Sequence, residues 1–133
     1  MHHLYHRLAS NTVAKKWALL IFWLTFLAIS ILMFIPGSPP KENGFMHWDK
    51  IQHAIAFMLL IKLAWSAYPN KKYIAVITLV LFGAAIEILQ ATLTTTRTGT
   101  TGDWIADVVG IMIGMTICIT LFQKNRQLKQ IRQ

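Results

Sequence analysis

The residue types that bind ions, hold phosphate or move protons are concentrated near the ends of hydrophobic stretches. The candidates are Asp49, Lys50, His53, Glu87, Gln90, Arg97, Asp103 and Asp107. Positions four apart share one face of a helix, as 49 and 53 do, and as 103 and 107 do. Ionisable groups inside membrane segments are costly, so they usually face other protein groups and mark a functional site. The spacing therefore predicts one shared polar site.

Three kinds of chemistry suit this set. In a binding protein, Lys50 and Arg97 would contact phosphate, with Arg97 as the better bidentate partner, and the carboxylates would hold sugar hydroxyls. In an enzyme, His53 would be the general base, oriented by Asp49 or Asp103. Arg97 would then stabilise developing negative charge. The third possibility is a buried ion-pair network that only fixes helix packing, and the catalytic residues stay unassigned.

Binding of a metal ion is a further alternative for the same residues. An oxygen-rich set suited to a divalent cation is formed by His53, Glu87, Asp103 and Asp107. A metal-free site is favoured at this stage, and the sequence identifies no cofactor. Three histidines near the N-terminus, His2, His3 and His6, also resemble a metal-binding tract. Such a tract is only a compositional hint, and no specific metal binding is expected there.

Four hydrophobic segments must position these groups, and we expect helices at about 17–35, 50–68, 73–92 and 104–122. The 133-residue chain is 55% hydrophobic and 14% charged, with a mean hydropathy of +0.48, whereas soluble domains carry about 25% charged residues. About 20 apolar residues span a bilayer as a helix. The segments lack the strict alternation of barrel strands. The sequence predicts an all-α membrane protein, a compact bundle of four transmembrane helices in a single domain, 1–133.

The distribution of basic residues predicts how this bundle is oriented. The net charge is +8, but the positions of the charges argue against nucleic-acid binding. Nine basic residues flank the helices on one side of the bundle: Arg7, Lys15, Lys16, Lys71, Lys72, Lys124, Arg126, Lys129 and Arg132. Lys41, Lys50 and Arg97 fall on the other side. The positive-inside rule then makes both termini cytoplasmic and places the candidate site at the extracytoplasmic face.

The polar residues also resemble the pattern of the VanZ-like membrane family. In that pattern Asp-Lys-x-x-His opens one helix and Glu-x-x-Gln ends the next, followed by Arg, by Asp six residues later, by a polar residue four further on and by spaced glycines. The matching residues are Asp49, Lys50, His53, Glu87, Gln90, Arg97, Asp103, Asp107, Gly110 and Gly114. The resemblance covers about residues 16–122. It departs at Asp107, where the family usually has Asn.

The resemblance implies a small multi-pass protein of the bacterial cytoplasmic (inner) membrane. The family's namesake is associated with resistance to the glycopeptide teicoplanin. The favoured function is therefore to bind or modulate a lipid-linked or cell-envelope headgroup, with membrane lipids and a lipid-linked envelope precursor as expected partners. The alternatives are a membrane-embedded hydrolase or transferase that uses His53 and the carboxylates, and a purely structural network. The sequence does not determine the oligomeric state.

Overall fold

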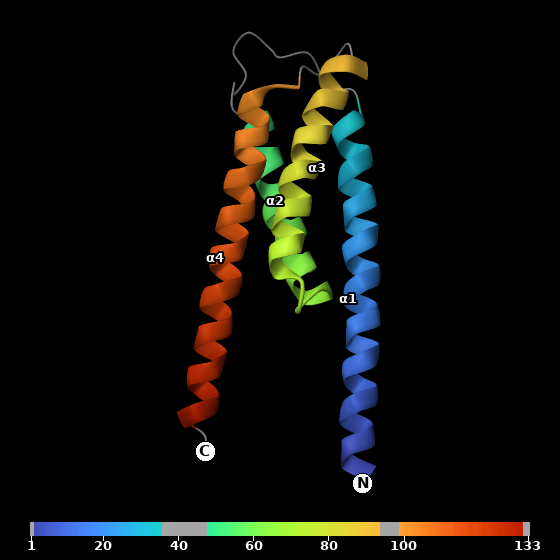
Figure 1. The fold of residues 1–133 in the computed structure, drawn as a ribbon, viewed down its shortest axis with the longest axis vertical. Helices are drawn as coiled ribbons and strands as arrows, with labels where there is room; N and C mark the ends of the chain where they lie inside the picture. The colour runs from blue at the N-terminus through green and yellow to red at the C-terminus, as the bar shows by residue number, and fades with distance from the viewer. Residues whose placement is uncertain (1, 36–47, 94–98, 132–133) are drawn as a thin grey trace.

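Four α-helices make up the described part of the chain in a computed structural model, which describes residues 2–35, 48–93 and 99–131 (Figure 1). They are α1 (His2–Phe34), α2 (Trp48–Ala67), α3 (Lys72–Leu93) and α4 (Thr101–Ile131). The predicted all-helical, four-helix architecture is confirmed. Two helices are longer than predicted, since α1 begins before residue 17 and α4 continues past residue 122. These extensions are polar, but they contain no proline or glycine to end a helix.

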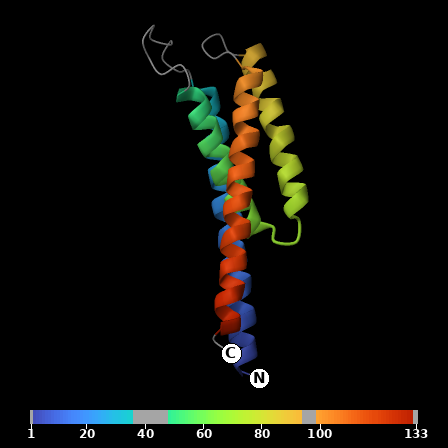
Figure 2. The same cartoon turned by 90° about the vertical axis from the view of Figure 1, so that its left-hand side faces the viewer.

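The helices alternate in direction, so that α2 and α4 are parallel to each other and antiparallel to α1 and α3 (Figure 1). The starts of α2 and α4 and the ends of α1 and α3 therefore lie at one end of the bundle, which we call the site end. At the opposite end, the first turns of α1 and the last turns of α4 extend past the connection between α2 and α3 (Figures 1 and 2).

Three of the helices are long and apolar enough to cross a membrane: Thr12–Phe34 within α1, and the whole of α3 and α4. Their outward faces are covered by large apolar side chains, among them Leu24, Ile31, Leu81 and Met112. Such extensive apolar exposure suits contact with lipid. The 20-residue α2, which carries polar residues in its first turns, is not among these three helices.

The closest packing in the bundle is between α2 and α4, and it depends on two glycines of α4. The backbone at Gly110 lies against the carbonyl group of Ala54, where a Cβ atom would collide with it. A Cβ atom at Gly114 would lie 2.8 Å from the carbonyl oxygen of Met58. Small residues allow helix backbones to approach in this way in membranes. Gly110 and Gly114 therefore mark the face on which α4 packs closely against α2.

Aromatic side chains join α1 to α2 and α3 in the other half of the bundle. The rings of Phe26 and Phe82 have centroids 4.4 Å apart, and those of Phe22 and Tyr68 lie edge to face at 5.7 Å. Trp23 Nε1 donates a hydrogen bond of 3.0 Å to the Tyr68 hydroxyl. A cavity of about 200 Å³ remains between these helices, with an almost wholly apolar lining. This half of the molecule is therefore ordinary apolar packing.

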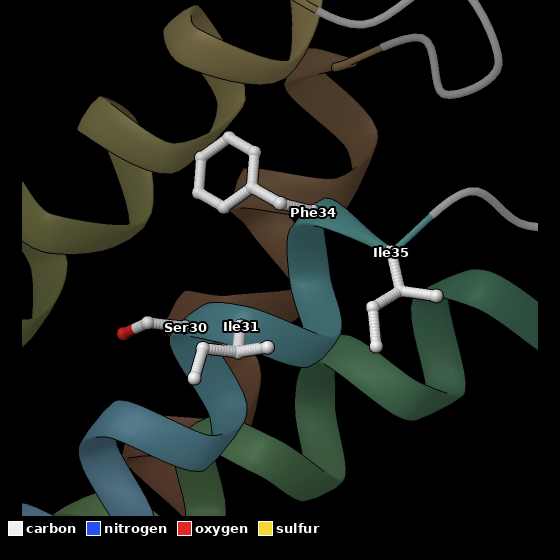
Figure 3. Close-up of a pocket in the computed structure, with 4 residues that line it drawn as sticks. All are labelled: Ser30, Ile31, Phe34 and Ile35. Atoms are coloured by element: carbon white, nitrogen blue, oxygen red, sulfur yellow. The ribbon is translucent and has the colours of Figure 1, made fainter.

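A shallow hollow at the C-terminal end of α1 is lined by Ser30, Ile31, Phe34 and Ile35 (Figure 3). Its only side-chain hydroxyl, on Ser30, donates a 2.7 Å hydrogen bond to the carbonyl of Phe26 within the same helix. None of its lining residues carries charge. The hollow therefore adds no reactive group to the candidate site.

Candidate functional site

Three ionisable side chains from three helices meet inside the bundle near the site end. His53 of α2, Glu87 of α3 and Asp107 of α4 are 2%, 7% and 0% exposed. His53 Nδ1 lies 2.9 Å from Asp107 Oδ1 and 3.4 Å from Glu87 Oε1. We call these residues the buried trio. Ionised carboxylates can only accept hydrogen bonds, so two of them facing Nδ1 favour the tautomer of His53 with the proton on that nitrogen.

A second polar pair lies one turn closer to the site end. Lys50 Nζ lies 2.9 Å from Asp103 Oδ1, and the two side chains are 41% and 4% exposed. The partners in this pair and in the His53–Asp107 pair are separated along the chain by 53 and 54 residues. This near-constant separation follows from the parallel arrangement of α2 and α4, because residues at the same distance from two parallel starts lie at the same depth. The two helices therefore carry matched charged pairs.

Thr100 connects the pair to the trio. Its hydroxyl donates a 2.6 Å hydrogen bond to Asp103 Oδ2 and accepts a weaker one, 3.3 Å, from the Asp103 backbone N–H. The second of these bonds caps the start of α4, because a side-chain oxygen accepts from the N–H of the third helical residue. The backbone N–H of Thr100 donates to Glu87 Oε2 at 2.8 Å. Gly99 packs directly against the Glu87 backbone carbonyl, where any side chain would collide, and this close approach brings Thr100 to α3.

Two carboxylate oxygens of the trio stay without a hydrogen-bond partner among the described residues. They are Glu87 Oε1 and Asp107 Oδ2, and both are inaccessible to solvent. Gly83 lies beside the second oxygen, and a Cβ atom there would come within 2.7 Å of it. Even with a protonated His53, two ionised carboxylates would leave the trio with a net negative charge. The trio is thus suited to receive a cation or a hydrogen-bond donor.

The remaining candidate residues fall in different places. Gln90 is buried one turn from Glu87, and its amide nitrogen donates 2.7 Å to the Met33 carbonyl in the last turn of α1. It thereby satisfies a carbonyl at a helix end, where intrahelical partners are missing. Asp49 lies at the exposed surface of α2. Arg97, to which phosphate binding and charge stabilisation were assigned, lies outside the described residues.

One expectation about an individual contact is wrong. Neither Asp49 nor Asp103 is the hydrogen-bond partner of His53, since Asp107 takes that place. The reason is depth, because Asp103 lies level with Lys50 and only Asp107 lies level with the imidazole. The sequence also did not predict that the Lys50 ammonium group would bond to Asp103, although its side chain stays partly exposed.

Of the four residues predicted to bind a metal, three lie together and the fourth, Asp103, lies apart. Ligand atoms of His53, Glu87 and Asp107 all lie within 4.8 Å of one another, which is compatible with a shared ion. Asp103 is instead engaged by Lys50 and Thr100. Thr100 itself was missed by the sequence analysis. Its signal is the Thr-x-x-Asp pattern at residues 100–103, which is typical of a helix N-terminus.

The sequence model of the VanZ/LLP1 family matches residues 9–123, which include α2, α3, most of α1 and α4, and every residue of the site. The chain belongs to the VanZ/LLP1 family. With its apolar helices, it is a VanZ-like, multi-pass membrane protein. No curated protein and no solved structure matched the chain.

The VanZ/LLP1 match leaves the chemistry to be argued from the arrangement itself. The half-exposed Lys50 can contact an anion near the surface of the bundle, while the buried trio can hold a proton or a cation beneath it. Because Nδ1 of His53 faces the carboxylates, Nε2 is the ring nitrogen left for another group. The site therefore combines a surface cation with a buried acidic centre.

Proposed function

We propose that this VanZ-like protein binds or modulates the anionic headgroup of a lipid-linked or cell-envelope component at the outer face of the bacterial cytoplasmic membrane. The observation that carries the proposal is the position of Lys50. Its ammonium group is fixed by the buried Asp103, yet its side chain is 41% exposed. A lysine has three N–H donors, so donors remain for a phosphate oxygen after the bond to Asp103 is made.

The proposal requires α2 to be a fourth span, and chain direction supports this. α1 ends at the site end, whereas α3 begins at the opposite end (Figure 1). Only α2 connects them, so it crosses the same layer if α1 and α3 do. Its 20 residues correspond to roughly 30 Å of helix, which is the thickness of a bilayer core. Its charged residues face α4 or lie near its ends.

The proposal also requires the site end to face outward, and the charge distribution supports that orientation. Lys72 lies at the opposite end, 4.6 Å from the centre of the Trp65 ring, and Arg126 extends beyond it on α4. An excess of basic residues is typical of the cytoplasmic side, whereas aromatic rings occur at both interfaces. The site end would then meet the outer leaflet, where lipid-linked envelope intermediates present their headgroups.

A second candidate function is a hydrolase or transferase, and the His53–Asp107 contact favours it. A carboxylate that binds Nδ1 prepares Nε2 to act as a general base. However, His53 is 2% exposed, so a substrate could reach it only after the helices separate. Binding at Lys50 needs no such opening, and for this reason it is the primary proposal.

The test compares two lysines of the same helix. Lys50→Ala removes the cation at the site end, and the control Lys62→Ala removes an exposed cation that lies twelve residues along α2. The protein would be placed in phosphatidylcholine nanodiscs containing a small fraction of phosphatidylglycerol, and retained lipids would be measured by native mass spectrometry. We expect Lys50→Ala to lose retained phosphatidylglycerol and Lys62→Ala to keep it.

A cellular assay completes the test, because family membership makes teicoplanin susceptibility the relevant phenotype. Expression of the wild-type chain should lower susceptibility, Lys50→Ala should weaken that effect, and Lys62→Ala should not. The double variant Lys50→Gln/Asp103→Asn removes the pair without leaving a buried charge, so it checks that any loss is not misfolding. Equal lipid retention and equal susceptibility for the Lys50 and Lys62 variants would refute the proposal. An effect of His53→Ala with normal lipid retention would favour the enzyme.

A further inference from the structure

We infer that His53, Glu87 and Asp107 bind a single divalent transition-metal ion, such as zinc or manganese, inside the helix bundle. The inference concerns the buried trio alone and does not depend on headgroup binding at Lys50. It starts from two buried oxygens, Glu87 Oε1 and Asp107 Oδ2, which have no hydrogen-bond partner among the described residues. The side chains that carry them are 8% and 0% exposed. A buried charged acceptor without a partner is costly to leave unsatisfied.

The distances within the trio suit coordination of one small ion. Ligand atoms about 2.1 Å from an ion lie about 3.0 Å apart at right angles and about 3.4 Å apart at the tetrahedral angle. Nδ1 of His53 is 2.9 Å from Asp107 Oδ1 and 3.4 Å from Glu87 Oε1. One ligand atom from each residue lies within 4.8 Å of the others. The two measured distances match these values, and the remaining adjustment needed for coordination is small.

The donor set selects the class of ion. One imidazole nitrogen and two carboxylates suit zinc, manganese and similar ions, whereas calcium prefers six to eight oxygen ligands and magnesium retains several waters. The two carboxylates carry two negative charges, which balance the two positive charges of the ion. This balance matters because an uncompensated charge buried among membrane helices is costly. On binding, the ion replaces the Nδ1 proton of His53, which leaves to solvent.

The groups around the trio hold its ligands in place. Thr100 donates its backbone N–H to Glu87 Oε2, so Glu87 Oε1 remains turned towards the imidazole. Gly83 leaves space beside Asp107 Oδ2 that a larger residue would occupy. Hydrogen bonds that orient metal ligands in this way commonly contribute to affinity.

Metal content of the purified full-length chain tests the inference. The protein would be produced without an affinity tag of histidines, treated with a chelator, and dialysed against zinc or manganese. Inductively coupled plasma mass spectrometry should then find one ion for each chain. Cobalt, added alone as a spectroscopic probe, should give a visible absorption band whose intensity reports the coordination number. His2, His3 and His6 would be replaced by Asn in a parallel background, so that the N-terminal tract cannot supply the signal.

Two conservative variants separate coordination from folding. Glu87→Gln and Asp107→Asn keep the side-chain size and remove a negative ligand. Loss of a residue that only orients a ligand costs about 10–100-fold in affinity, so loss of a ligand should cost at least about 100-fold. Thr116→Ala is the control, because it removes an exposed hydroxyl of α4 that donates only to the Met112 carbonyl and should leave the metal content unchanged. Circular dichroism would confirm that all variants keep their helices.

Two results would overturn the inference. One is a wild-type chain that stays metal-free after exposure to each ion. The other is equal metal content in the wild type, Glu87→Gln and Asp107→Asn, because the ion would then be held elsewhere. If a variant loses its helices, the X-ray absorption spectrum of the wild type decides instead, with one nitrogen and two carboxylate oxygens expected around the ion.

Discussion

At the scale of single residues, the site depends on a threonine with no obvious catalytic chemistry. Thr100 binds Asp103 through its hydroxyl and Glu87 through its backbone N–H. It therefore holds one residue of the surface pair and one residue of the buried trio. Thr100 therefore helps to position a carboxylate of α3 relative to one of α4, as His53 does deeper in the bundle.

Replacement of Thr100 by alanine should reveal this role. Thr100→Ala removes the hydroxyl that caps α4, and cap losses cost about 0.5–2 kcal/mol in the free energy of unfolding. Thr100→Ser keeps the hydroxyl and should therefore retain most of the stability that the cap contributes. Denaturation in mixed micelles, followed by circular dichroism, provides the measurement.

The control is Thr116→Ala in the same helix. The exposed Thr116 hydroxyl donates only to the Met112 carbonyl within α4, so its loss should stay within about 0.5 kcal/mol. If the Thr100 and Thr116 variants were equally stable, the capping role would be wrong.

At the scale of helices, the site depends on the parallel pair α2 and α4. Gly110 and Gly114 allow the two backbones to touch below the trio. This contact fixes the depth of one helix against the other, and thereby aligns Lys50 with Asp103 and His53 with Asp107. A change of register by one residue would rotate each partner by about 100° around its helix and separate the pairs.

Gly110→Ala should force these helices apart. Its new Cβ would meet the Ala54 carbonyl, which is backbone and cannot turn aside. Overpacking of this kind typically costs about 1–3 kcal/mol, and we expect a lower melting temperature in detergent.

Gly102→Ala is the matched change near the start of α4. Its Cβ would lie 3.1 Å from Lys50 Cε, in a flexible side chain that can move. It should be close to neutral. A Gly110 variant as stable as the Gly102 variant would show that the helices do not need this close contact.

At the scale of the whole molecule, the four alternating helices separate an acidic end from a basic end. Apart from the terminal extensions, most outward side chains on α1, α3 and α4 are apolar and suit lipid. Within the described residues, the carboxylates all lie at the site end. A molecule divided in this way should insert with one fixed orientation.

Cysteine labelling tests the orientation. Cys118 is the single native cysteine and lies within α4, so it would first be replaced by serine. A cysteine at Ser38 or Thr98 should react with an impermeant reagent added outside intact cells, and one at Asn70 should react only after lysis. The reverse pattern would place the site end in the cytoplasm and remove the basis for an envelope ligand.

Sequence patterns predicted the helices well and individual contacts less well. Apolar length marked all four helices, since a segment that avoids water is recognisable from composition alone. The spacing of Asp103 and Asp107 indicated that α4 presents both carboxylates on one face. The expectation that Asp49 or Asp103 would bind His53 failed, because spacing within a helix does not give the depth of a neighbouring helix.

The sequence by itself determined the class of protein, the number of helices and the family, because these follow from hydrophobic length and from short motifs that are local in the chain. Tertiary structure alone decided which charges meet. The pairing of His53 with Asp107, of Lys50 with Asp103, and of Glu87 with the Thr100 backbone depends on the register of helices that are far apart in sequence. That register is set by the contact of Gly110 and Gly114 with α2, which is a property of packed surfaces and not of any one segment.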